Sequence, residues 1–168
     1  MELDNSKLNR LANYLFRLSR VSFVLHLLLI GILTVTLSVL SFYNSILASY
    51  PADFEIESIS AFDFIGYCFF VPIAETLIFV VLPYRVYLSL SFFKRNPLLL
   101  VIISAIIFAL LHIWLTSIIY IFPHFFITCA FWIFGYFVRA GRKKGPFWDI
   151  VIAHGLYNGL TLLMEFLM

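Results

Sequence analysis

Four polar side chains, Glu75, His112, His154 and Asn158, stand in apolar parts of the chain and are the residues best suited to chemistry. Glu75 lies in a stretch from 61 to 83 whose only other charged residue is Asp63. A charged side chain at the centre of a bilayer costs about 2.5 kcal/mol or more. Because every polar group in such a place needs a partner, we expect these four side chains to meet in a functional site.

A glutamate, two histidines and an asparagine can together hydrolyse an amide. The carboxylate beside a histidine can hold and deprotonate a water molecule, while the second imidazole and the amide donate hydrogen bonds to the oxyanion that forms. The set of Glu75, His112 and His154 could instead bind a divalent metal such as zinc, which would activate the water. Either arrangement predicts peptide-bond hydrolysis inside a membrane, with no serine or cysteine nucleophile.

Helix geometry places the four residues at a similar depth. At a rise of 1.5 Å per residue, His154 lies roughly 11 Å from the cytoplasmic end of its span and Glu75 roughly 13 Å. Asn158 comes at roughly 17 Å and His112 at roughly 20 Å on the same measure. His154 and Asn158 are four residues apart and therefore share one helix face. We expect a single pocket in the cytoplasmic half of the membrane.

The composition is that of a membrane protein. Of 168 residues, 63% are hydrophobic and 12% are charged, whereas a soluble domain has about 25% charged residues. At this length the chain is predicted to form one domain. Cys68 and Cys129 both fall in apolar runs, which argues against a disulfide framework. No feature supports nucleic-acid binding, and the expected partners are the lipid bilayer and a membrane-associated substrate.

Five stretches are apolar over about the 20 residues that a helix needs to cross a bilayer. We therefore predict an all-α, polytopic helical bundle whose spans cover residues 21–43, 61–83, 98–118, 119–138 and 147–168. Gly155 and Gly159 in the last span would allow a close approach between helices. His26, alone in the first span, and His124, beside Pro123 at an expected helix end, are interpreted as packing residues.

The basic residues predict the orientation of the bundle. They fall before the first span, between the second and third, and between the fourth and fifth: Lys7, Arg10, Arg17, Arg20; Arg85, Lys94, Arg95; and Arg139, Arg142, Lys143, Lys144. Segment 44–60 carries only Asp53, Glu55 and Glu57, and the turn at 120–124 has no basic residue. By the positive-inside rule, the N-terminus is expected in the cytoplasm and the C-terminus on the far side, in a multi-pass protein of the inner membrane.

The N-terminal segment is expected to lie on the cytoplasmic surface of the membrane. Within residues 6–20, leucines recur at helical spacing with arginines around them: Leu8, Leu11, Leu15 and Leu18. This pattern is typical of an interfacial amphipathic helix. We accordingly divide the chain into a cytoplasmic segment, 1–20, and a transmembrane bundle, 21–168.

The spacing of the polar residues resembles the motifs of the CPBP family of intramembrane proteases, which includes the type II CAAX prenyl endopeptidases. The family's motifs run Glu-Glu-x-x-x-Arg, Phe-x-x-x-His and His-x-x-x-Asn. Phe108 to His112 matches the second and His154 to Asn158 the third, and the resemblance covers about residues 68–165. It implies an intramembrane endopeptidase, of metallo- or glutamate type, that cleaves a CAAX-type or other membrane-associated substrate. In this family Glu75 would activate the water and His112 would assist, while His154 and Asn158 would stabilise the oxyanion.

The first motif departs from the family's pattern. Glu75 is kept, but Thr76 stands in place of the second Glu and Val80 in place of the Arg. This loss favours an alternative in which the chain is a non-catalytic membrane factor with an immunity, regulatory or assembly role. A third possibility is a proton or ion carrier that uses Glu75 and the histidines as a relay; the lack of inverted repeats argues against it.

Overall fold

The computed structural model describes residues 6–49, 61–116, 122–141 and 145–167, and within these ranges the chain is helical apart from short connections. The α-helices are α1 (Ser6–Arg17), α2 (Arg20–Ser49), α3 (Ala61–Ile65), α4 (Val71–Thr76), α5 (Leu82–Ser89), α6 (Ser91–Arg95), α7 (Pro97–Thr116), α8 (Phe122–Ala140) and α9 (Phe147–Leu167). Two π-helical turns, η1 (Gly66–Phe70) and η2 (Leu77–Val81), join α3, α4 and α5 into one composite helix.

The two π-helical turns have a cause in the sequence. Pro72 and Pro83 each stand at the start of the helix that follows a π turn. Proline has no N–H to donate and its ring clashes with the carbonyl group four residues earlier, and a π turn relieves both effects by widening the helix. The composite helix therefore passes two prolines without breaking, and Glu75 lies on the α-helical piece between the two turns.

The ends of other helices also follow local signals. The Ser19 hydroxyl accepts a hydrogen bond from the Ser22 N–H at 3.1 Å and so caps α2. Pro97 begins α7, a position where a missing N–H costs nothing. Gly145, with φ of +53°, turns the chain before α9, in a conformation that favours glycine.

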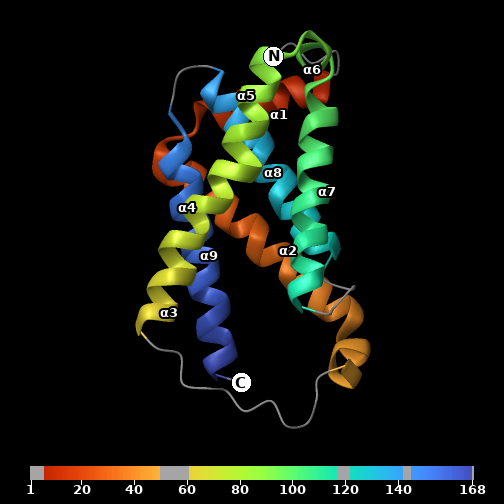
Figure 1. Ribbon diagram of the computed structural model, residues 1–168, viewed down its shortest axis with the longest axis vertical. Helices are drawn as coiled ribbons and strands as arrows, with labels where there is room; N and C mark the ends of the chain where they lie inside the picture. The colour runs from red at the N-terminus through yellow and green to blue at the C-terminus, as the bar shows by residue number, and fades with distance from the viewer. Residues whose placement is uncertain (1–5, 50–60, 117–121, 142–144, 168) are drawn as a thin grey trace.

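Figure 1 shows the helices arranged as a bundle along the long axis of the molecule. α1 and α6 lie at one end, and the C-terminus lies at the other, while α2 crosses the bundle obliquely. α8 packs against α7 and α2, and α9 packs against α2, α4 and η1. The centre of the packing is apolar, with fully buried Phe23, Leu27, Ala105, Ile133 and Ile150. The site residues on α4, α7 and α9 are held by these helix contacts.

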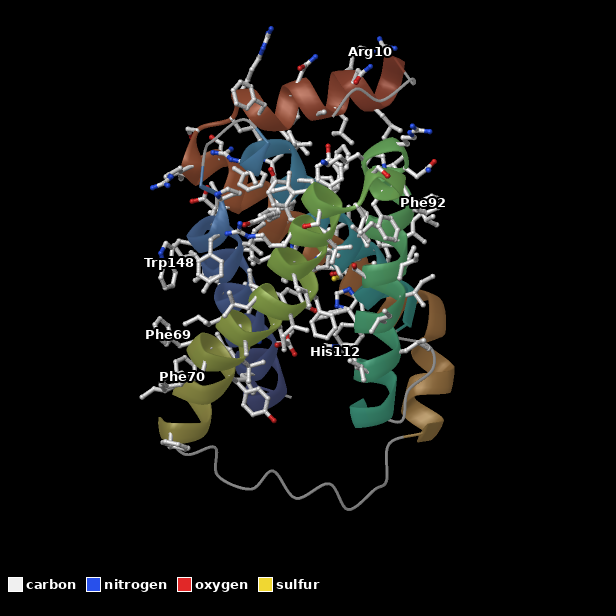
Figure 2. The ribbon with its side chains drawn as sticks, turned by 45° about the horizontal axis from the view of Figure 1, so that its top comes forward. Arg10, Phe69, Phe70, Phe92, His112 and Trp148 are labelled. Atoms are coloured by element: carbon white, nitrogen blue, oxygen red, sulfur yellow. The ribbon has the colours of Figure 1, made fainter. Side chains whose placement is uncertain are left out.

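α1 covers one end of the bundle (Figure 2). Its Ala12 and Leu15 are buried against the core, and Leu8 is partly buried beside them. Leu11, in contrast, is 37% exposed, and Arg10 points away from the bundle. The leucine stripe predicted to rest on lipid therefore packs in part on the protein itself.

Arg139, at the end of α8, joins three helices at this end of the molecule. Its guanidinium group donates to the carbonyl oxygens of Leu15 and Leu18, at 3.4 and 3.2 Å. It lies 3.7 Å from a carboxylate oxygen of Asp149 at the start of α9 and 4.2 Å from the centre of the Phe23 ring. Arg139 was predicted only as a charge that sets the orientation, but it is buried and ties α8 to the α1–α2 corner and to α9.

Most predicted spans coincide with helices, but their limits differ. α2 continues to Ser49, beyond the predicted end at 43, and the second span stays helical to Ser89, so Arg85 lies on a helix and not in a loop. Within the described ranges, one helix, Gly66–Ser89, is long and apolar enough to cross a membrane. Three shorter helices are apolar: Arg20–Thr34, Pro97–His112 and His124–Ala140. The acidic residues of 50–60 and the basic residues of 142–144 lie outside the described residues.

Candidate active site

Glu75, His112 and His154 meet in the interior of the bundle, from three different helices. A carboxylate oxygen of Glu75, Oε1, lies 3.6 Å from Nε2 of His112 on α7. The other oxygen, Oε2, lies 3.3 Å from Nε2 of His154 on α9. The three side chains are largely buried, and His154 is the most deeply buried of them. His112 points between α7 and the composite helix in Figure 2. The structure thus brings three of the four predicted residues into direct proximity.

Phe108 fixes the orientation of His112. Nδ1 of His112 lies 2.9 Å from the carbonyl oxygen of Phe108, one helical turn earlier. Because a carbonyl can only accept, Nδ1 carries a proton, and a neutral His112 presents an acceptor at Nε2, toward Glu75. The rings of Phe108 and Phe125 flank the imidazole, with centroids 4.1 and 4.4 Å away. The Phe-x-x-x-His spacing therefore supplies both a hydrogen bond and a stacking partner.

Trp132 holds the second histidine and was missed by the sequence reasoning. Its indole ring packs on His154 with ring centroids 4.7 Å apart. Its Nε1–H donates to the carbonyl oxygen of Leu27 on α2 at 3.3 Å. The available signal was a tryptophan inside an apolar span, because a buried indole N–H needs an acceptor. Trp132 thereby positions His154 by bracing α9 against α2 and α8.

A small cavity adjoins Glu75. Its volume is about 10 Å³. It is lined by Glu75, Thr76, Phe79, Val80, Phe108, Cys129, Trp132 and His154. Thr76 and Val80, the two positions where the first motif departs from the family's pattern, are only 1% and 3% exposed. Among these lining residues Glu75 is the only acid and none is Lys or Arg, so the cavity holds one carboxylate and one imidazole in apolar surroundings.

Asn158 contacts a different part of the composite helix. Its Nδ2 donates to the carbonyl oxygen of Tyr67, in η1, at 2.9 Å. The same face of α9 approaches η1 closely at Gly155, where a Cβ atom would collide with the carbonyl oxygen of Cys68. At Gly159 a Cβ would lie 3.5 Å from the Cys68 sulfur, an ordinary contact. Asn158 thus joins α9 to η1, and it is not among the residues that line the cavity.

His124 belongs to a separate buried network that connects α2, α8 and α9. Its Nδ1 lies 2.8 Å from the Thr34 hydroxyl, which in turn lies 2.8 Å from the Thr128 hydroxyl. Its Nε2 is hydrogen-bonded to the Tyr157 hydroxyl. Both ring nitrogens are therefore engaged in holding helices together, as a packing residue requires. His26 bonds locally, to Tyr14 and to the Ser22 carbonyl.

The alternative of a metal bound by Glu75, His112 and His154 finds no support in the described residues. No group of three or more His, Cys, Asp or Glu side chains in the described ranges is arranged to hold a metal ion. We therefore assign no step of the chemistry to a metal.

Comparison with known proteins gives one match. The family model of the "Type II CAAX prenyl endopeptidase Rce1-like" proteins matches residues 57–160, more than half of the chain. Comparison with curated proteins and with solved structures gave no match. The matched range contains all four predicted site residues, and it confirms the resemblance found in the motifs. The chain therefore belongs to the Rce1-like type II CAAX prenyl endopeptidases, a family of membrane-embedded proteases.

Proposed function

We propose that this protein is an intramembrane endopeptidase that hydrolyses a peptide bond of a membrane-associated substrate, with Glu75 as the general base. The observation that carries the proposal is the position of the Glu75 carboxylate, between the Nε2 atoms of His112 and His154 and beside a buried cavity. Proton transfer between such groups needs a contact of about 2.6–3.2 Å or one bridging water, and contacts that are longer without substrate can tighten when it binds. Family membership supports the reaction class.

In the proposed reaction a water molecule beside Glu75 attacks the carbonyl carbon of the substrate. Glu75 takes one proton from the water as the new C–O bond forms, and His112, through its Nε2 acceptor, helps to orient the water. His154 donates to the oxyanion. When the intermediate collapses, the C–N bond breaks and the proton held by Glu75 passes to the leaving amine, so the enzyme returns to its starting state.

Asn158 has a double role in this proposal. A carboxamide carries two N–H donors, and one of them binds the Tyr67 carbonyl oxygen. The second is the donor that we assign to the oxyanion. Holding the amide on η1 limits its rotation, which is the kind of preorganisation that oxyanion stabilisation needs.

The fold supports a multi-pass arrangement of about five crossings. Helices α2, α3–α5, α7, α8 and α9 alternate in direction along the long axis of the bundle (Figure 1). Large apolar side chains are exposed on outward faces of these helices, among them Leu29, Phe69, Ile106 and Leu156, as is expected of a surface in contact with lipid. The basic residues of α1, α6 and the end of α8 share one end of the molecule, which we assign to the cytoplasm.

The test is cleavage by the native protein compared with Glu75→Gln. The probe is an internally quenched, farnesylated CAAX peptide in detergent micelles, with other membrane-associated candidates tested by co-expression. The substitution keeps the shape and one oxygen but removes the basicity, so the rate should fall about 10²-fold or more. Glu165→Gln, the same chemical change near the end of α9, is the matched control and should retain the native rate. Addition of a zinc chelator separates the two routes to an activated water: an unchanged rate supports Glu75 without a metal, and a lost rate supports a bound metal.

A second function is favoured by the neutral residues at 76 and 80. A non-catalytic membrane factor would keep the helix packing but would have no need of a base at position 75. In that case Glu75→Gln would preserve the cellular phenotype of the native chain at normal protein abundance. That outcome would replace the protease proposal by the binding or assembly role.

A further inference from the structure

Thr76 carries a buried hydroxyl group beside Glu75. Its side chain is 1% exposed, and its Oγ1 has no hydrogen-bond partner among the described residues. It lines the same cavity as Glu75 and His154. A hydroxyl removed from water without a partner destabilises the folded state, so its presence in this position calls for a partner in the cavity.

Other hydroxyl side chains in the described helices form hydrogen bonds within the protein. Thr34 and Thr36 each donate to the carbonyl oxygen four residues earlier, at 2.8 Å. Ser89 does the same with the Arg85 carbonyl at 2.9 Å. This bond is the usual one for a hydroxyl in the middle of a helix. Thr76 does not form this hydrogen bond. Its hydroxyl group is therefore able to donate a hydrogen bond to a molecule in the cavity.

The cavity has the size and the polar groups that a single water molecule needs. Its volume, about 10 Å³, is close to the minimum that holds one water, about 10–15 Å³. A buried water makes about three hydrogen bonds. The Thr76 hydroxyl and the Glu75 carboxylate are polar groups on the lining residues that can provide two of them. The rest of the lining is apolar apart from the His154 imidazole, the Cys129 thiol and the indole N–H of Trp132, which is bonded to Leu27.

We infer that the Thr76 hydroxyl holds the hydrolytic water against Glu75, as a positioning residue of the proposed protease reaction, on which this inference rests. Thr76 donates its O–H to one lone pair of the water oxygen, while the water donates a hydrogen to Glu75. The second lone pair is then directed at the substrate carbonyl. Thr76 neither gains nor loses a proton in the step, and the proton released by the water goes to Glu75.

Thr76 stands at the position that the resemblance aligns with the second Glu of the family's motif. Val80, in place of the family's Arg, lines the same cavity and has no polar side-chain atom. Of the two substituted positions, only 76 can bind a water molecule.

The test compares Thr76→Val, which keeps the shape and removes the hydroxyl, with Thr76→Ser, which keeps the hydroxyl. With the farnesylated, quenched peptide, Thr76→Val should lower kcat about 10-fold, the value of about one hydrogen bond, with KM unchanged. Thr76→Ser should stay within about twofold of the native kcat by the same reasoning. The thermal stability of Thr76→Val should equal or exceed that of the native protein, because the lost hydroxyl has no protein partner.

Thr128→Val is the matched control, because Thr128 is also buried but its hydroxyl bonds Thr34 within the protein. It should lower the thermal stability and leave kcat per folded molecule unchanged. If Thr76→Val behaves like this control, the hydroxyl is structural and the inference is wrong. A native kcat for Thr76→Val, in a preparation where Glu75→Gln is inactive, would overturn the inference and leave the proposed function intact.

A high-resolution structure of the native protein supplies a readout that does not depend on activity. It should show a water molecule within about 3.2 Å of Thr76 Oγ1 and of a Glu75 oxygen, and this water should be absent in Thr76→Val. A dry cavity in the native protein would refute the inference. If the native protein cleaves none of the substrates, the proposed function fails, and the presence or absence of this water still decides the role of Thr76 as a water ligand.

Discussion

Thr76 and Val80 place two neutral side chains beside Glu75, at the positions where the family's motif has a Glu and an Arg. The pair can be restored by Thr76→Glu together with Val80→Arg, and each change can also be made alone. We expect the free energy of unfolding of the double variant to be higher than the sum of the two single changes predicts. The reason is that both positions are almost completely buried, so a new charge there has little water to interact with.

The size of the effect follows from the lining of the cavity. Thr76→Glu alone adds a second carboxylate next to Glu75, and an uncompensated buried charge costs about 3–5 kcal/mol. Val80→Arg alone overfills a cavity of about 10 Å³, at about 1–3 kcal/mol, and directs its guanidinium group at Glu75. In the double variant the two new charges neutralise each other. The coupling free energy should therefore reach about 2 kcal/mol in favour of the double variant, within the range known for contacting residues.

The measurement is a double-mutant cycle on the free energy of unfolding, determined by SDS titration in mixed micelles. The matched control is a second cycle with Thr76→Gln and Val80→Met, which adds similar volume without charge. A coupling below about 0.5 kcal/mol, or an equal coupling in the neutral cycle, would refute the electrostatic argument. Peptidase activity should be lost in Val80→Arg alone, because its guanidinium group competes with the water for Glu75.

Three further predictions concern other parts of the structure. Gly155→Ala should lower the free energy of unfolding by about 1–3 kcal/mol, because its Cβ collides with a carbonyl oxygen of η1. Gly159→Ala should change it little, and thermal unfolding of the two variants checks this pair. Arg139→Met removes the buried partner of Asp149 but leaves the exposed Arg20 at 3.6 Å. It should therefore lower the free energy of unfolding by less than the about 3–5 kcal/mol of an uncompensated buried charge, and adding Asp149→Asn should recover part of that loss in the same assay. A reporter fused after Lys144 should read as cytoplasmic, and an external signal would reverse the proposed orientation.

Much of the fold could be predicted from the sequence, because the local signals and the hydrophobic pattern agree. The predicted span at 98–118 corresponds to α7, which begins at Pro97, and the span at 147–168 corresponds to α9. The π turns were not predicted. Proline marks where an α-helix is disturbed, but whether the chain kinks, breaks or widens depends on neighbouring helices, here α9 against η1 and α4.

The site could be predicted in part. Glu75, His112 and His154 were predicted because an unpaired polar side chain in an apolar span has a high free-energy cost. The structure places the three side chains close together. Their catalytic roles stay a prediction. The sequence could not indicate that the Asn158 amide binds a carbonyl oxygen of η1, because that contact depends on the approach of α9. Nor could it identify Trp132, since stacking on His154 depends on how α8 and α9 are rotated.

The charge of Glu75 can be accommodated without the family's second Glu and Arg. An arginine beside a carboxylate keeps the carboxylate ionised and takes up its oxygens in hydrogen bonds. An imidazole can instead share a proton with the carboxylate and release that proton again. Glu75 faces two imidazoles and no guanidinium group among the described residues of the site. Because Thr76 and Val80 are neutral together, no buried charge is left without a partner. The site can then be electrically neutral when a histidine carries the extra proton beside the ionised Glu75, and the Glu75 carboxylate can accept the proton of water.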